Sequence, residues 1–143
     1  ITGKIDIDHF ASISLVSYET KTKQIEFIGA GHQAMMIWRK QKNKIELFQQ
    51  KTDPIGIDIR SIYKSIKIPF DCGDVAALYT DGIIESLNTS GEQYGETRLA
   101  QMIADNHTAP SKDIANKIKR DMISFIGKAP THDDRTLLII KAR

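Results

Sequence analysis

The sequence predicts an α+β fold, in which helices pack on antiparallel β-sheet. Three observations support this class. Strand-like segments fill the first half of the chain, two segments with helical spacing follow, and one more strand-like segment closes it. A parallel sheet would require strands and helices to alternate along the chain, and the sequence lacks that alternation.

The first half contains four short segments rich in β-forming residues. Polar or glycine-rich stretches separate them, such as Thr20–Lys23, Gly29–His32 and Gln41–Lys44. The segments with strand character are 10–18, 24–28, 34–39 and 45–48. Short spacings of this kind predict an antiparallel meander.

Two further strands are expected before the helices begin. In the segment 62–68, Ile62, Ile66 and Ile68 share one face, which is typical of a half-buried strand that Pro69 ends. A turn then leads into Val75–Tyr79, which is apolar on both faces. We therefore expect Val75–Tyr79 to be a central strand.

The second half adds two amphipathic helices and a closing strand. The segment 96–106 places Leu99, Met102 and Ile103 on one face. The segment 111–126 carries a longer apolar stripe, formed by Ile114, Ile118, Met122, Phe125 and Ile126. Gly127 and Pro130 end this helix. The strand 136–140 is again apolar at every position but its first, so we expect it to be buried on both faces.

Composition limits the possible functions. The chain has 143 residues, of which 41% are apolar and 27% charged, as in one ordinary globular domain. The net charge of +2 gives no reason to expect nucleic acid or direct membrane contact. No apolar stretch approaches the roughly 20 residues that span a bilayer. One cysteine fits a reducing compartment, so we expect a cytoplasmic location, while a membrane tether elsewhere in a longer protein stays open.

Acidic residues lie at one end of each doubly apolar strand. Asp81 follows Val75–Tyr79, whereas Asp133 and Asp134 precede the strand 136–140. If the two strands are antiparallel neighbours, these ends meet and the carboxylates converge. Converging carboxylates repel one another unless a cation lies between them, and hard divalent cations prefer oxygen ligands. Gly82 would let the backbone and water approach such an ion closely.

Each acidic motif also has a simpler explanation. Asp-Gly is one of the commonest turn dipeptides, so Asp81–Gly82 taken alone is a turn. His132, Asp133 and Asp134 taken alone form a solvated loop that enters a strand. The residues by themselves leave the turn and the metal site open as alternatives.

Several motifs in a fixed order resemble a known family. They are "FIGAGHQAMMIWR", "PIGI", "CGDVAALYTDG", "LYTDGIIES", "GEQYG" and "HDDRTLLII". The chain resembles the C-terminal part of the metal-dependent (PPM, protein phosphatase 2C-like) protein phosphatases. It is most similar to the bacterial branch that includes the sporulation and general-stress phosphatases. The resemblance extends from about Phe10 to Lys141.

The resemblance implies a fold and a set of site residues. The fold is an antiparallel β-sandwich flanked by antiparallel helices. Two Mn²⁺ or Mg²⁺ ions at one end of the sandwich hold the water that attacks phosphoserine or phosphothreonine. By position, Asp81 and Asp133 match metal ligands of the family. Gly82 and Asp134 match neighbours of the ligands, and Asp134 stands where many relatives have asparagine.

The resemblance also implies a substrate and a partner. The substrate class is a phosphorylated anti-sigma-factor antagonist or a similar small signalling domain, in bacterial stress or developmental signalling. An isolated half of the fold would leave sheet edges unpaired, so we expect it to form a homodimer, to swap strands or to retain only part of the fold.

One departure from the family pattern is serious. Relatives have an N-terminal half with an acidic Gly-Asp motif and an Asp-x-x-Gly-His-Gly motif, and neither occurs here. Asp6 and Asp8 are a less favoured substitute for these ligands. We therefore expect residues 1–143 to be the C-terminal part of a larger phosphatase domain, inactive alone. The alternative is a non-catalytic regulatory or dimerisation module.

Overall fold

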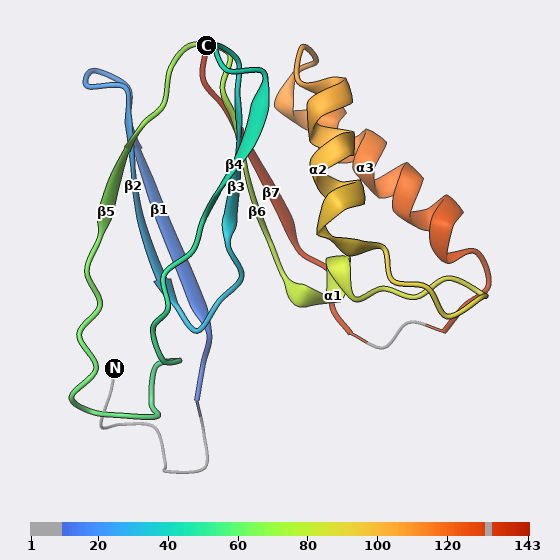
Figure 1. The fold of residues 1–143 in the computed structure, drawn as a ribbon, viewed down its shortest axis with the longest axis horizontal. Coiled ribbons are helices and arrows are strands. Elements are labelled where there is room, and N and C mark those ends of the chain that lie inside the picture. Colours follow the sequence, from blue (N-terminus) through green and yellow to red (C-terminus); the bar gives the residue numbers. More distant parts are fainter. Residues whose placement is uncertain (1–9, 131–132) are drawn as a thin grey trace. The chain divides into compact units, whose positions relative to one another are not determined.

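The computed structural model describes residues 10–130 and 133–143 (Figure 1). The chain divides into two compact units. The first comprises the described residues up to Ala34 together with Phe48–Asp71, and the second comprises Met35–Leu47 together with the described residues from Cys72 to Arg143. No helix in the described ranges is long and apolar enough to cross a bilayer.

The first unit is built on a three-stranded antiparallel sheet. Its strands are β1 (Ile13–Glu19), β2 (Gln24–Ala30) and β5 (Ile66–Pro69), in the order β1-β2-β5. The alternation in β2 buries Ile25 and Phe27 on one face, as the period of a half-buried strand requires.

The strand predicted over 62–68 is wrong in its first half. Ile62 is 74% exposed, and β5 begins at Ile66. The side chain of Gln50 explains the late start. Its Nε2 donates to the carbonyl of Lys64 at 2.6 Å, and its Oε1 accepts the Gly29 N–H at 2.6 Å. An amide side chain thus takes the hydrogen bonds that would extend the β2–β5 pairing.

The second unit combines a four-stranded sheet with the helices. The sheet order is β4 (Lys44–Phe48), β3 (Met35–Arg39), β6 (Val75–Tyr79) and β7 (Leu137–Lys141). A single meander was therefore the wrong prediction, because the strands of the first half divide between two sheets. The α+β class with antiparallel sheets is confirmed.

Both predicted helices are present and pack against this sheet (Figure 1). They are α2 (Gly95–Asn106) and α3 (Ser111–Ile126), and a short helix α1 (Asp81–Ile84) follows β6. The side chains that the two longer helices bury are Leu99, Ile103, Ile114, Ile118, Met122 and Ile126. They share one core with Val75, Ala77 and Tyr79 of β6, so the predicted apolar stripes are confirmed.

The two doubly apolar strands differ in burial. In β6, Val75, Ala76, Ala77 and Tyr79 are buried, as expected of a central strand. In β7, by contrast, Leu138 is 47% exposed. Its neighbours Leu137 and Ile139 pack against the core, so Leu138 lies on the other, more exposed face and the predicted burial on both faces is wrong.

Candidate metal centre

The pairing of β6 with β7 brings the two acidic segments together. The strands are antiparallel, and Tyr79 lies opposite Leu137. One residue further, the Thr80 N–H donates to the Thr136 carbonyl at 3.2 Å. The end of β6 therefore meets the start of β7, which is the geometry that the sequence predicted. The role of the acidic residues as metal ligands stays a prediction.

The Thr80 hydroxyl joins the same two segments. It donates to the carbonyl oxygen of Asp134 at 3.2 Å and accepts the Thr136 N–H at 3.0 Å. Thr80 is the N-cap residue of α1, yet its side chain makes no capping hydrogen bond to that helix. Sequence reasoning missed this residue, although threonine directly before an acidic helix start is a recognisable N-cap signal.

Gly82 lies against the opposite segment. It is buried in α1, and a Cβ atom there would come within 2.3 Å of the Asp134 carbonyl oxygen and 3.4 Å of the Asp133 Cβ. We expected Gly82 to let the backbone and water approach a bound ion closely. The atoms that require glycine here belong to the chain entering β7, and Asp81–Gly82 forms the first turn of α1.

The candidate ligands are exposed and held by their own backbone. Asp81 Oδ1 accepts the N–H of Gly82 at 3.0 Å, and Asp133 Oδ1 accepts the N–H of Asp134 at 2.7 Å. Asp134 is exposed as well. Among the residues that the structure describes, the Oδ2 atoms of Asp81 and Asp133 make no hydrogen bond. Both carboxylates thus keep an oxygen for a cation.

The described side chains offer the type of ligand that a hard divalent cation prefers, but too few of them to complete a site. Carboxylate oxygens suit Mn²⁺ and Mg²⁺. The described part of the chain nevertheless holds no group of three or more His, Cys, Asp or Glu side chains arranged to bind a metal. His132, Asp6 and Asp8 lie outside the described residues. The site described is therefore part of a metal centre at most.

A cavity of about 240 Å³ adjoins the candidate ligands. Residues in its wall are Gly82, Glu85, Leu87, Ile126, Asp133 and Arg135. Glu85 is exposed at this wall. The cavity combines apolar walls with charges of both signs beside Asp133.

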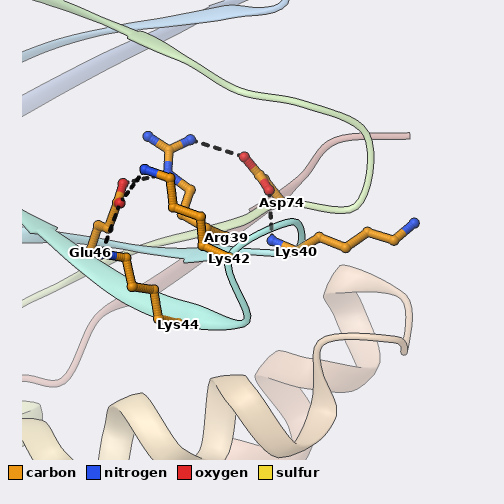
Figure 2. A network of polar contacts seen from close by, with 6 residues as sticks. All are labelled: Arg39, Lys40, Lys42, Lys44, Glu46 and Asp74. Carbon is orange, nitrogen blue, oxygen red and sulfur yellow. Dashed lines mark hydrogen bonds and ion pairs between the residues drawn. The ribbon is translucent and has the colours of Figure 1, made fainter.

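A second acidic residue at the other end of β6 has a different environment (Figure 2). Asp74 is 3% exposed and accepts a hydrogen bond from Arg39 Nη1 at 2.9 Å and another from the Lys40 N–H at 2.9 Å. Arg39 also pairs through Nε with Glu46 at 2.8 Å. Sequence reasoning predicted only a turn, which includes Asp74, before Val75–Tyr79. The signal it missed is an arginine that ends one strand while an aspartate precedes another.

Glu46 is stabilised as a carboxylate in this network. Hydrogen bonds from Lys42 and Arg39 lower the pKa of Glu46 to about 2, against the opposing effect of burial. A charged acceptor between two cations is favoured over the neutral acid. This end of the sheet therefore neutralises its acidic residues internally.

Two tyrosines hold the helices that flank the site. Tyr79, the last residue of β6, donates to Glu96 of α2 at 2.8 Å, and burial raises the pKa of Tyr79 well above its usual range. Tyr94 donates to Asp121 of α3 at 2.8 Å, and Arg98 pairs with both oxygens of Asp121. The end of β6 is thus anchored to α2, and α2 to α3.

Comparison with known families assigns the chain. The sequence profile of one family, described as Stage II sporulation protein E (SpoIIE), matches residues 1–143. The chain belongs to this family. The suspected resemblance to the sporulation and general-stress branch of protein phosphatases is confirmed.

Two curated relatives are similar over nearly the whole chain. Protein IcfG of Synechocystis sp. is 25% identical over 136 residues, which is 94% of this chain and 21% of that protein. Phosphoserine phosphatase RsbU of Bacillus subtilis is 22% identical over 143 residues, which is all of this chain and 42% of that protein. The chain thus spans less than half the length of either relative.

The fold resembles that of a solved phosphatase domain. The SiaA-PP2C domain of Pseudomonas aeruginosa matches with a TM-score of 0.80 and 22% identity, over 92% of this chain and 52% of that one. The likeness supports a PP2C-like fold, of which this chain spans about half.

Proposed function

We propose that this chain is the C-terminal part of a metal-dependent, PP2C-like serine/threonine phosphatase domain. Membership of the SpoIIE family and the PP2C-like fold support this proposal. The observation that carries it is the antiparallel pairing of β6 with β7, which brings the segment with Asp81 to the segment with Asp133. The chain alone is inactive, because two carboxylates hold a divalent cation weakly.

The residues of the chain have distinct roles in this reaction. The metal centre, when bound, supplies an activated water and offsets charge on the transferred phosphoryl group. Asp81 and Asp133 provide oxygen ligands from two neighbouring segments. Gly82 and Asp134 keep those segments in contact. The cavity beside Asp133 admits the polypeptide that carries the phosphoryl group.

The substrate is a phosphoserine or phosphothreonine on a small signalling protein of the anti-sigma-factor antagonist type. RsbU, which matches the whole chain, is named a phosphoserine phosphatase. We place the reaction in the cytoplasm, with Mn²⁺ or Mg²⁺ as the ions and a homodimer as the assembly.

A second candidate is a non-catalytic regulatory or dimerisation module derived from the same fold. One observation favours it: the described residues include no group of three metal-binding side chains. In that case the exposed carboxylates would bind no divalent cation at physiological concentration.

The test is Mn²⁺-dependent dephosphorylation of a phosphoserine protein by the full-length protein that contains this chain. Asp81→Asn and Asp133→Asn should each abolish metal-dependent turnover and weaken Mn²⁺ binding at least tenfold, since each removes a charged ligand. Asp105→Asn, at an exposed position of α2, is the matched control and should behave as wild type. Absence of Mn²⁺-dependent turnover and Mn²⁺ binding in the wild-type protein would leave the non-catalytic module as the better account, whereas full activity in both site variants would contradict the ligand roles of Asp81 and Asp133.

A further inference from the structure

Thr80 uses its hydroxyl in an unexpected way. A threonine at an N-cap ordinarily accepts a hydrogen bond from an N–H of the helix that it starts. Thr80 makes no such bond to α1. Its hydroxyl instead donates to the Asp134 carbonyl and accepts the Thr136 N–H, at 3.2 Å and 3.0 Å. The side chain therefore acts across the two strands and not along its own helix.

The Asp134 carbonyl lies between Thr80 and Gly82. The Thr80 hydroxyl donates a hydrogen bond to this oxygen. The Cα of Gly82 lies so close that an added Cβ atom would be 2.3 Å from the same oxygen. The hydrogen bond resists movement of this peptide away from β6, and the contact with Gly82 resists movement toward α1. Asp133, the preceding residue, is located by the same constraint.

We propose that Thr80 is a positioning residue, whose hydroxyl sets the separation between the Asp81 and Asp133 carboxylates. This inference rests on the proposed function. Metal–ligand distances tolerate about 0.2 Å, so a shift between the two segments weakens binding even when both carboxylates are present. Outer groups that orient metal ligands typically account for 10–100-fold in affinity or activity.

The variant Thr80→Val isolates the hydroxyl. Valine keeps the shape of threonine, and the bond from the residue 80 N–H to the Thr136 carbonyl involves backbone atoms alone. Thr80→Ser restores the hydroxyl without the methyl group. Thr52→Val is the matched control, because the Thr52 hydroxyl donates to the Gly29 carbonyl at 2.6 Å in the other unit.

The experiment measures Mn²⁺ affinity by calorimetry, thermal unfolding without metal, and kcat and KM, all on the full-length protein. Thr80→Val should bind Mn²⁺ 10–100-fold more weakly and lose kcat with little change in KM. Thr80→Ser should stay within about threefold of wild type. Thr52→Val should lower the melting temperature of the metal-free protein about as much as Thr80→Val does, with unchanged Mn²⁺ affinity.

The outcomes separate this inference from the proposed function. Wild-type Mn²⁺ affinity in Thr80→Val, with binding lost in Asp81→Asn, would overturn the role of Thr80 and leave the metal centre intact. Unchanged binding in Asp81→Asn would overturn the proposed function itself. If Thr80→Val does not fold, Thr80→Ser decides: affinity near wild type supports the hydroxyl, and a loss above tenfold contradicts it.

Discussion

The carboxylates at the two ends of β6 have opposite environments. Asp74 immediately precedes the strand, is 3% exposed, and is bonded by Arg39 and by the Lys40 N–H. Asp81 follows the strand after Thr80, is exposed, and accepts the N–H of Gly82. The strand is the same, so the difference lies in what the neighbouring strands bring to each end.

At the Asp74 end the adjacent strand β3 ends in a buried cation, Arg39, whereas at the Asp81 end the adjacent strand β7 follows the exposed acids Asp133 and Asp134 and the partly exposed Arg135. An acid that meets a buried arginine is neutralised inside the fold. Acids that meet acids repel one another until an external cation joins them. The comparison teaches that the first end is structural and that the second is suited to binding a cation.

The largest effect on stability is expected from Asp74→Asn. This change leaves the Arg39 guanidinium, which is 9% exposed, without its buried charge partner, although Glu46 still pairs with it. Breaking a buried ion pair from one side costs about 3 kcal/mol. Urea unfolding should show this loss while Mn²⁺ affinity stays at the wild-type value. A parallel loss of Mn²⁺ affinity would mean that the two ends of β6 are not independent.

Gly82→Ala should have a smaller effect on stability and a larger one on metal binding. The added Cβ would be 2.3 Å from the Asp134 carbonyl oxygen, so one of the two segments must move. Such overpacking lowers the free energy of unfolding by about 2 kcal/mol. The displacement should also reduce Mn²⁺ affinity more than tenfold, as calorimetry would measure. Wild-type affinity in Gly82→Ala would contradict the close contact.

The smallest effect concerns acid sensitivity at the Asp74 end. The folded-state pKa of Glu46 is about 2, below its ordinary value of 4.5, so the unfolded chain binds this proton more readily. The stabilisation by Glu46 is therefore fully present above about pH 4.5 and is lost as pH falls toward 2. Glu46→Gln should flatten the dependence of unfolding free energy on pH in that window. An unchanged slope would show that other carboxylates govern acid unfolding.

Local pattern predicted most elements because each buries a regular stripe. The central strand Val75–Tyr79 and both long helices follow from the spacing of their apolar residues. The meeting of the Asp81 and Asp133 segments followed from one assumption, that two apolar strands with acids at opposite ends pair antiparallel.

Features that depend on distant partners were not predictable in this way. The strand β5 starts late because a glutamine from another segment takes its hydrogen bonds. Leu138 is exposed because it lies on the face of β7 opposite the core, and its own apolar character does not indicate which face is covered. Arg39, the cation that pairs with Asp74, is 35 residues away in the sequence. The residues next to Asp74 in the chain do not indicate that it is buried. Local sequence specifies periodicity, while these features depend on tertiary pairing.

The most direct test is the crystal structure of the full-length protein soaked in Mn²⁺, with manganese located by its anomalous scattering. The account predicts manganese at the end of β6, with carboxylate oxygens of both Asp81 and Asp133 bound to the metal centre at about 2.1 Å. Manganese bound elsewhere, with both carboxylates facing solvent, would contradict it.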